Sequence, residues 1–370
     1  MAIARITTYA TRAVTLVRVV AEDGAEGWGQ TAPFHADLTA QVLHRQVAPH
    51  ALGRDEADIP GLCTAVIEGE YKFPGSYVCR ALAGVETALW DLRGRREGRP
   101  VCALLGGPER PSPMPAYGSS MRRDIKPSQE AERLARLRDS HGYRAFKIRI
   151  GKVCGHDVDE WPGRTEEIIP AVRRAVGGEC VVLADGNSGF SPRRAIAVGR
   201  ILEEHGYGHF EEPCPYWELE QTAEVAAALD VPVAGGEQDT DLAQFRRMVQ
   251  MDAVDIVQPD VCYVGGIARA REAARLAAAR SKPCTPHSAN RSLVTVFTMH
   301  LLAALPNAGP FLEFSIEPSA WTDALFEPRL EAVDGRVPFP AEGPGWGVRI
   351  RPEWLERADR QESALPSQRE

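Results

Sequence analysis

Three short apolar runs, each ending in an acidic residue, recur at equal intervals in the middle of the chain. The runs are VVLAD, GHFEE and VPVAGGE, and they end at Asp185, at Glu211 or Glu212, and at Glu237. With Glu211 as the second acid, both intervals are 26 residues, enough for one strand, one helix and two loops. Parallel strands buried on both faces occur as such runs, and a crossover helix connects each strand to the next. The repeat therefore predicts three consecutive parallel strands, each with a carboxylate at its C-terminal end.

The segments between these acids have the pattern of helices. Apolar residues recur at helical spacing in SPRRAIAVGRILEEHG and ELEQTAEVAAALD. The acids would then lie at the strand ends where ligands bind in barrels and open α/β sheets. Three oxygen ligands without Cys or His suit a hard divalent cation, and we expect Mg²⁺. Any single acid could instead be the N-cap of the next helix, but three at equal spacing favour a metal site.

Strand and helix patterns alternate along the centre of the chain, from a Pro-rich segment at residues 106–115 to about Glu313. Eight apolar runs are expected to be strands: MPAYGSS, YRAFKIRIG, VVLAD, YGHFEE, PVAGGE, AVDIVQPDV, SKPCTPHS and PFLEFSIE. Eight strands in one parallel series predict a closed barrel rather than an open sheet. We therefore expect an α/β fold with a barrel over residues 111–317.

The two ends of the chain are expected to form a second, smaller domain. Residues 3–31 alternate like the strands of an antiparallel sheet, and residues 36–106 have helical patterns. The clearest helix covers residues 76–98 and places on one face Ala81, Val85, Ala88 and Leu92. We predict an α+β domain over residues 1–110 that is completed by the Pro- and Gly-rich segment 318–370. The polar last residues, RADRQESALPSQRE, are expected to be frayed.

Composition excludes several classes of function. The 370-residue chain has a net charge of −8, and its Lys and Arg residues are scattered, which gives no support for binding nucleic acid or anionic membranes. No window reaches the roughly 18 apolar residues of a membrane-spanning helix, and no cleavable signal pattern begins the chain, so we expect a cytoplasmic protein. Eight dispersed cysteines without C-x-x-C pairs argue against a zinc cluster or a disulfide framework.

Further charged residues lie at the ends of other predicted strands. Lys147 and Arg149 are two apart and thus on the same face of the second strand. Asp260 lies near the end of the sixth strand, and His287 follows the seventh. These groups suit proton transfer: a carboxylic acid bound through its carboxylate to Mg²⁺ loses its α-proton more easily. His287 can act as the base, with Asp260 fixing its tautomer.

Simpler interpretations of these residues remain open. His287 by itself, in TPHSANRS, is equally well explained as a capped or core histidine. Lys147 and Arg149 could form salt bridges to the metal-binding acids without any catalytic role. The combination of a histidine, a nearby aspartate and three acids of the metal-binding type favours catalysis over the simpler alternatives.

The order of short motifs resembles the mandelate racemase subgroup of the enolase superfamily. The motifs are KIR, ADGN, FEEP, GGE, QPD, GG, PHS and LE, and the resemblance extends to ALAGVETALWDLRGRREGRPVCALLGG and GPGWGV. It implies an α+β capping domain, formed by both chain ends, over a modified TIM barrel of the (β/α)7β type. It also implies a homo-oligomer and a small-molecule carboxylate as substrate.

The resemblance assigns roles to individual residues. It implies that Asp185, Glu211 and Glu237 are Mg²⁺ ligands and that His287 and Asp260 form a catalytic dyad with His287 as the general base. Glu313, on the eighth strand, would be a hydrogen-bond donor or an electrostatic partner to the substrate carboxylate. Glu212, next to Glu211, would face the other way and be a neighbour of the ligands rather than a ligand.

One position departs from the family pattern. The family carries Lys-x-Lys on the second strand, whereas this chain has Arg149 at the second position. Arginine stays protonated in proteins and is a poor base, so the two-base mechanism of racemisation is disfavoured. One base suffices for dehydration, and that pattern resembles acid-sugar dehydratases, with Lys147 and Arg149 stabilising the enediolate or binding a substrate hydroxyl.

We therefore expect dehydration of an aldonate or aldarate to a 2-keto-3-deoxy acid. One alternative is a racemase or epimerase of a 2-hydroxy or amino carboxylate, and another is a catalytically idle metal-binding barrel. Cycloisomerisation fits the resemblance poorly, because it usually accompanies a lysine-based site without the His-Asp pair.

Other residues are weaker candidates. Asn187 could touch the metal-bound carboxylate or Lys147, or it could be a helix N-cap. The first-domain residues His35, Tyr71 and Lys72, with the adjacent Phe73, lie where the family has substrate-covering loops. Gln258 is interpreted as structural.

Overall fold

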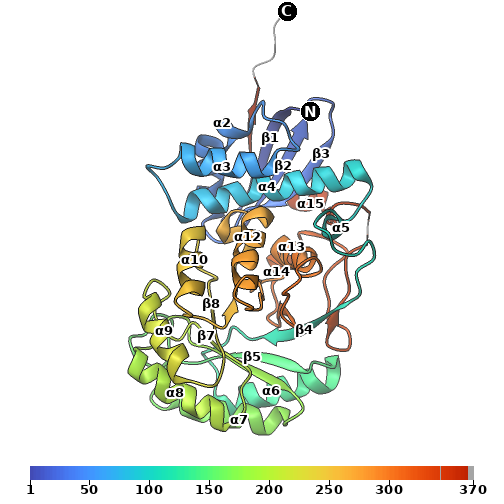
Figure 1. Ribbon diagram of the computed structural model, residues 1–370. Helices are drawn as coiled ribbons and strands as arrows, with labels where there is room; N and C mark the ends of the chain where they lie inside the picture. Colours follow the sequence, from blue (N-terminus) through green and yellow to red (C-terminus); the bar gives the residue numbers. More distant parts are fainter. Residues whose placement is uncertain (342, 366–370) are drawn as a thin grey trace, which may run out of the picture.

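The molecule consists of an antiparallel sheet with its helices, which we call the cap, lying over a curled parallel sheet surrounded by helices, which we call the barrel (Figure 1). The structure is a computed structural model that describes residues 1–341 and 343–365. The cap sheet has the order β14-β1-β2-β3, with β1 (Ile3–Ala10), β2 (Thr15–Ala21), β3 (Glu26–Gln30) and β14 (Asp359–Ala364). The cap helices are α1 (Ala36–Val42), the π-helix η1 (Leu43–Val47), α2 (Ala48–Ala51), α3 (Ile59–Gly69) and α4 (Ser76–Glu97).

The long helix α4 packs closely on strand β3. The face predicted for it is buried, with at most 1% exposure at Ala81, Val85, Ala88 and Leu92. Two glycines of β3 make the close approach possible. A Cβ atom on Gly27 would lie 2.2 Å from the carbonyl oxygen of Ala88, and one on Gly29 would lie 2.3 Å from that of Gly84. The backbone of α4 therefore occupies the space that side chains at these two positions of β3 would need.

The carboxylate of Glu86 ties helix α4 to the barrel. It accepts the backbone N–H groups of Ile267 (2.9 Å) and Ala268 (2.8 Å), which begin helix α12 (Ile267–Ala278), and the indole N–H of Trp90 (2.9 Å). Burial raises the pKa of Glu86 to about 7, although these three hydrogen bonds oppose the shift. A negative side chain at a helix N-terminus satisfies N–H groups that have no partner within the helix. The cap thus has a fixed position over this part of the barrel.

The last strand of the cap sheet comes from the C-terminal segment that was expected to be frayed. Residues 359–364 form β14, which pairs antiparallel with β1 from Arg5 opposite Ala364 to Ala10 opposite Asp359. The expectation was wrong for these residues, because an edge strand is held by backbone hydrogen bonds and needs few apolar side chains. The remaining part of the predicted frayed end, residues 366–370, lies outside the described residues.

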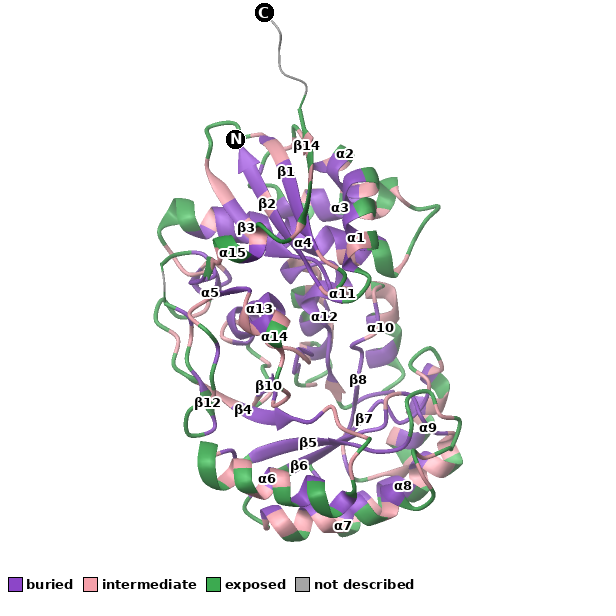
Figure 2. Cartoon of the chain, turned by 180° about the vertical axis from the view of Figure 1, so that it is seen from behind, coloured by how far each residue is buried: buried purple, intermediate pink, exposed green. Residues whose placement is uncertain are grey.

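The barrel strands follow the predicted series. They have the spatial order β10-β4-β5-β6-β7-β8-β9 and are parallel. Their bounds are β4 (Met114–Ser119), β5 (Ala145–Arg149), β6 (Val181–Asp185), β7 (Phe210–Glu211), β8 (Val233–Gly235), β9 (Ile256–Val257) and β10 (Leu312–Ser315). The other barrel helices are α6 (Pro127–His141), α7 (Arg164–Val176), α8 (Pro192–Glu204), α9 (Leu219–Ala228), α10 (Leu242–Gln250), α11 (Val261–Val264) and α13 (Leu293–Leu302). Figure 2 shows the strands buried and the outer helix faces exposed.

The predicted seventh strand, SKPCTPHS, differs from the prediction. Instead of a regular strand, this segment makes single parallel bridges, between Cys284 and Val257, between Cys284 and Ala308, and between His287 and Asp260. Pro283 and Pro286 have no N–H group to donate to a ladder. The segment still occupies the seventh place, between β9 and the chain that leads into β10, and it carries His287 to the same end of the barrel as the acids.

The chain after β10 passes beside the barrel before it returns to the cap. Its elements are α14 (Ala320–Asp323), β11 (Phe326–Glu327), β12 (Arg336–Val337), β13 (Arg349–Ile350) and α15 (Pro352–Leu355), and the short helix α5 (Val101–Leu104) follows α4. Strand β12 pairs antiparallel with β4, and β11 pairs with β13. The domain boundaries at residues 110 and 317 stay a prediction. Within the described residues, no helix is long and apolar enough to span a membrane.

The contact between β3 and α4 makes a prediction about stability. Gly27→Ala places a methyl group against the backbone of Ala88 and Leu92, so the free energy of unfolding should fall by about 1–3 kcal/mol or more. Urea denaturation followed by circular dichroism measures the change. The control is Gly178→Ala, where the added Cβ meets nothing within 4 Å and the change should stay within about 0.5 kcal/mol. Equal stability of the two variants would contradict the close packing.

Candidate active site

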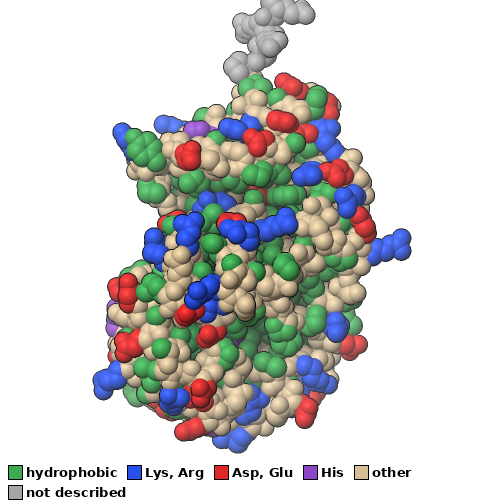
Figure 3. Space-filling view, in the orientation of Figure 1, with side chains coloured by type: hydrophobic (Ala, Val, Ile, Leu, Met, Phe, Trp, Pro, Cys, Tyr) green, Lys and Arg blue, Asp and Glu red, His purple; other side chains and the backbone are tan. Residues whose placement is uncertain are grey.

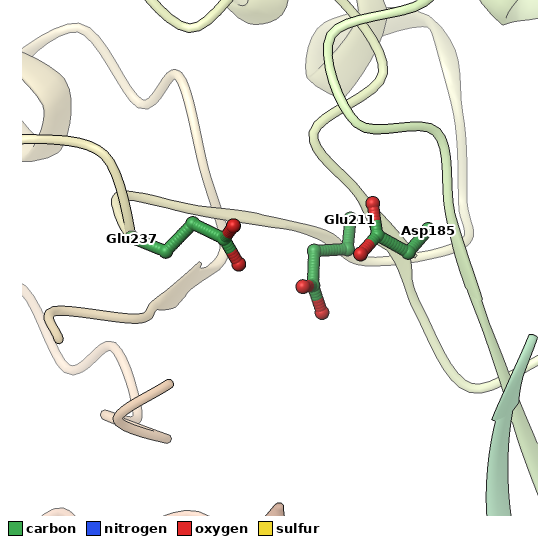
Figure 4. A group of neighbouring side chains, drawn as sticks. All are labelled: Asp185, Glu211 and Glu237. Carbon is green, nitrogen blue, oxygen red and sulfur yellow. The ribbon is translucent and has the colours of Figure 1, made fainter. Parts of the chain in front are cut away.

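The three acids of the sequence repeat come together at one end of the barrel. Asp185 ends β6, Glu211 ends β7, and Glu237 follows β8; all three are buried. One carboxylate oxygen from each lies within 4.8 Å of the others. Figure 4 shows the carboxyl groups of Asp185 and Glu237 directed toward the region beside Glu211. Three converging carboxylates without Cys or His form the donor set that Mg²⁺ prefers, so the residues present suit such an ion.

Each of the three acids contacts a different cationic side chain. The guanidinium of Arg149 contacts Asp185, and the ammonium of Lys147 lies 2.6 Å from Glu211 Oε1. Glu237 Oε2 lies 3.3 Å from Nε2 of His287. Lys147 and Arg149 thus lie on one side of β5, as predicted from their spacing. The salt bridges foreseen as the simpler role for these two residues are present, and they do not exclude a catalytic one.

The ionisation of the acids follows from these contacts. Burial would raise the pKa of Glu211, but the Lys147 ammonium and His209 hold it well below its usual range. For Glu237 burial prevails, and its pKa is raised although His287 opposes the shift. Burial would lower the pKa of Lys147, yet the carboxylates of Glu211 and Glu313 raise it above its usual value. Lys147 therefore remains a cation in this arrangement.

His287 and Asp260 form the predicted pair. His287 Nδ1–H donates to Asp260 Oδ2 over 2.7 Å. The other oxygen of Asp260 accepts the backbone N–H groups of Cys262 (2.7 Å) and Tyr263 (3.0 Å), so Asp260 also caps the short helix α11. This leaves the imidazole Nε2 facing the acids. Burial would lower the pKa of His287, but Glu237 and the neighbouring carboxylates raise it to about 10.

Glu313 lies beside Lys147 at the end of β10. Its Oε1 forms an ion pair with the Lys147 ammonium (2.9 Å) and accepts a hydrogen bond from Ser119 Oγ (2.8 Å), and its Oε2 accepts the backbone N–H of Ser288 (2.9 Å). Burial would raise its pKa, but the Lys147 and His287 cations lower it to about 2. Glu313 is therefore an ionised acceptor in this arrangement, and its role toward a substrate carboxylate stays a prediction.

The guanidinium of Arg149 is engaged on all sides. Besides its contact with Asp185, its Nε donates to the carbonyl oxygen of Ser120 (3.0 Å) and its Nη1 to Asn187 Oδ1 (3.2 Å). Its Nη2 lies 2.8 Å from the sulfur of Met121. These contacts hold Arg149 as a fixed positive charge next to one of the acids.

Asn187 supports the carboxylate of Asp185. Its backbone N–H donates to Asp185 Oδ1 (2.7 Å) and its side-chain amide to Oδ2 (3.1 Å). The alternative that Asn187 is a helix N-cap is wrong, because Ser191 caps α8. Asn187 also accepts a hydrogen bond from Arg123 (2.7 Å), whose pKa is lowered to about 9 by burial and by the nearby cation Arg149.

The first-domain candidates lie apart from this cluster. His35 precedes α1 and is exposed, as are Tyr71, Lys72 and Phe73. The ammonium of Lys72 lies over the ring of Tyr71, 5.8 Å from its centroid. Within the described residues, the hydrogen bonds and ion pairs of the cluster include none from these four side chains. Their contact with a substrate stays a prediction.

Some polar neighbours of the acids were not recognised from the sequence. Gln258, interpreted as structural, donates to Glu211 Oε2 over 2.9 Å. His209 Nε2 lies 3.3 Å from the same oxygen, and its position two residues before Glu211 could have indicated a shared strand face. Ser119 and Ser288 were also missed, because small hydroxyl residues are too common to stand out. Glu212 lies near the amide of Asn187 (3.5 Å).

Comparison with known protein families covers nearly the whole chain. Residues 1–106 match the N-terminal domain of mandelate racemase and muconate lactonizing enzyme. Residues 129–354 match the enolase C-terminal domain-like family. The two matches correspond to the cap and the barrel with its return segment.

Characterised relatives have different activities. The arabinonate dehydratase of Saccharolobus solfataricus is 28% identical over 347 residues, covering 91% of this chain and 88% of the relative. The D-galactarolactone cycloisomerase of Agrobacterium fabrum is 30% identical over 350 residues, covering 92% and 89%. Both relatives therefore align over most of their length, and their names describe a dehydration and a cycloisomerisation.

Solved structures agree with the fold. A protein from Roseobacter denitrificans, provisionally described as a racemase, is 55% identical and superposes with a TM-score of 0.96 over 99% of this chain and 100% of its own. A mandelate racemase/muconate lactonizing protein from Paracoccus denitrificans, complexed with magnesium, is 30% identical with a TM-score of 0.86 over 99% of both chains. The chain therefore belongs to the enolase superfamily, in its mandelate racemase and muconate lactonizing group, and its buried Asp185, Glu211 and Glu237 form a metal site typical of the magnesium-binding members.

Proposed function

We propose that the protein is a Mg²⁺-dependent lyase that removes water from an acid sugar, an aldonate or aldarate, to give a 2-keto-3-deoxy acid. The observation that carries the proposal is the presence of one base, His287, together with an arginine in place of the family's second lysine. A dehydratase among the relatives supports this reaction class. The proposal includes a small carboxylate as substrate; the homo-oligomer and the cytoplasmic location stay predictions.

His287 has the surroundings that a base needs. Its Nδ1–H is held by Asp260 (2.7 Å), which keeps the Nε2 lone pair of the neutral ring on the side of the acids. The pair is buried, so water competes little for the proton. His287 would take the proton from C2 of the substrate and, as imidazolium, return it to the departing C3 hydroxyl. The substrate thus loses one water molecule, and the resulting enol becomes the keto acid.

The other cations would stabilise negative charge rather than accept protons. Arg149 is fixed by Asp185, Ser120 and Asn187, and a guanidinium does not deprotonate in proteins. Lys147 donates a hydrogen bond to Glu211 and forms an ion pair with Glu313. A single effective base suits elimination better than inversion at C2, which requires a base on each side of the carbon.

The metal would be held by the carboxylates at the ends of β6 and β7 and after β8, namely those of Asp185, Glu211 and Glu237. Bound there, Mg²⁺ would polarise the substrate carboxylate and compensate the negative charge that raises the pKa of His287. Asn187 would orient Asp185 through its two hydrogen bonds. On the face shown in Figure 3, Lys and Arg side chains lie where the cap meets the barrel, with Asp and Glu side chains among them.

A racemase or epimerase is the second candidate, because the 55% identical structure carries that provisional description. Inversion would need a second base, and Lys147 is the nearest lysine to the acids. The two candidates differ in one observable: an epimerase exchanges the C2 proton without losing water.

Removal of a metal ligand should abolish stabilisation by Mg²⁺. In the wild type, added Mg²⁺ should raise the melting temperature, because a ligand of the folded state stabilises it by RT ln(1 + [L]/Kd). Glu237→Gln removes one charged ligand, and the shift should largely disappear. Isothermal titration calorimetry gives the affinity directly. The control Asp124→Asn changes an exposed aspartate outside the site and should bind Mg²⁺ like the wild type; equal binding by Glu237→Gln would contradict the assigned ligand.

Replacement of the base should separate chemistry from metal binding. His287→Asn should reduce turnover by at least about 10²-fold, the lower end of general-base contributions, while Mg²⁺ affinity in calorimetry stays within a few-fold. His141→Asn, an exposed histidine at the end of α6, serves as the control and should keep full turnover. Activity of His287→Asn near that of the wild type would refute the assignment.

A screen of acid sugars with Mg²⁺ in D₂O should identify the reaction. We expect 2-keto acid to form from one or a few stereoisomers, detected as the semicarbazone and by NMR. Deuterium in recovered substrate without keto acid would instead establish epimerisation. Neither product from any aldonate or aldarate would contradict the proposed substrate class.

A further inference from the structure

Tyr263 contacts both members of the His287–Asp260 pair. It lies on α11, three residues after Asp260, and its backbone N–H donates to Asp260 Oδ1 over 3.0 Å. Its ring packs against the imidazole of His287, with 5.9 Å between centroids and 50° between planes. These values are those of an attractive tilted aromatic pair. One residue therefore touches the base through its side chain and the supporting aspartate through its backbone.

One face of the Tyr263 ring is covered by an arginine of the cap. The guanidinium carbon of Arg80, on α4, lies 3.7 Å from the centroid of that ring, well inside the roughly 6 Å range of a cation–π contact. Figure 2 shows α11 next to α4. Arg80 contacts Tyr263, and Tyr263 contacts His287. We call this row of three side chains, which leads from the cap to the base, the stack. Glu86, six residues along α4, anchors the same helix to α12.

We propose that Arg80 and Tyr263 are positioning residues that hold the His287 imidazole in the orientation in which Nε2 faces the acids. The proposal rests on the assignment of His287 as the base. A ring held only by its hydrogen bond from Nδ1 to Asp260 retains freedom to swing about that bond, and a packed aromatic neighbour restricts this motion. Through the stack, the packing of the cap on the barrel affects the orientation of the His287 imidazole.

The position of the stack explains why two residues are needed. Tyr263 lies on a short helix, α11 (Val261–Val264), which by itself restrains a side chain weakly. The contact with the Arg80 guanidinium restrains the ring from the cap. A reacting group displaced by about 1 Å can lose about 10²-fold in rate, so modest loosening of the ring has a measurable effect on kcat.

The test compares four variants of the full-length protein. Tyr263→Leu removes the ring, and Tyr263→Phe keeps it. Arg80→Met removes the cation and keeps the aliphatic stem. The control, Arg93→Met, removes another cation from α4 that lies over an aromatic ring, that of Trp90 at 5.6 Å, and that ring is not packed on the His287–Asp260 pair. Thermal melting shows that each variant is folded, and if Tyr263→Leu does not fold, Arg80→Met carries the test.

Two readouts are measured on each variant. The first is kcat and KM for dehydration of the acid sugar found in the screen. The second is the NMR signal of the His287 Nδ1 proton in protein labelled with ¹⁵N-histidine, without substrate. The signal is assigned by its loss in His287→Asn. It reports how firmly the imidazole is held, which a general loss of stability elsewhere would not change.

We expect Tyr263→Leu and Arg80→Met to lower kcat by about tenfold, with KM changed less than about twofold, since misplacement of a reacting group acts mainly on the chemical step. In both, the Nδ1 proton signal should broaden through faster exchange with water. Tyr263→Phe and Arg93→Met should resemble the wild type in both readouts.

Three outcomes would overturn the proposal: an unchanged Nδ1 signal in folded Tyr263→Leu or Arg80→Met, an unchanged kcat in both, or a loss in Tyr263→Phe as large as in Tyr263→Leu, which would assign the effect to the hydroxyl. A wild type without dehydratase activity would count against the proposed function alone. In that case the NMR signal, which needs no substrate, still decides whether the stack holds the imidazole.

Discussion

The burial of several carboxylates at one end of the barrel is the constraint on which the site depends. Asp185, Glu211 and Glu313 are fully buried, and an isolated buried carboxylate costs several kcal/mol or more in stability. Glu211 and Glu313 have lowered pKa values because Lys147 lies beside both of them, and backbone and hydroxyl donors supply further hydrogen bonds to this cluster. Such a cluster of buried charges produces a strong local electric field, which acts on a bound divalent cation and on an anionic substrate.

The fold brings these charges together by simple means. In a parallel series every strand ends on the same side, so residues far apart in the chain meet there. The register places Asp185 opposite Glu211 across β6 and β7. Two prolines turn the seventh strand into single bridges, yet the bridge between Asp260 and His287 keeps the base in line with the acids. The cap then closes over this end through α4.

Errors in the sequence-based predictions occurred where side-chain pattern and backbone bonding diverge. The C-terminal residues are polar but form β14, since β1 supplies backbone partners. The seventh segment was apolar enough for a strand, but its prolines lack donors. His209 and Ser119 escaped notice, and Gln258 was interpreted only as structural, because a polar residue beside a buried acid looks, in sequence, like any other polar residue. Only the three-dimensional position of Glu211 and Glu313 gives them meaning.

The sequence by itself determined the fold class, the three metal-type acids, the His287–Asp260 pair and the replacement of a lysine by Arg149. The first three depend on periodicity and on spacing along the chain, whereas the arginine stands out only against the pattern of the family that the chain resembles. The tertiary structure alone decided that Asn187 supports Asp185 instead of capping a helix, that Arg149 is held by Ser120 and Asn187, and that Arg80 stacks on Tyr263 beside the base. Such contacts join residues distant in sequence, and their geometry arises only when the cap and barrel pack together.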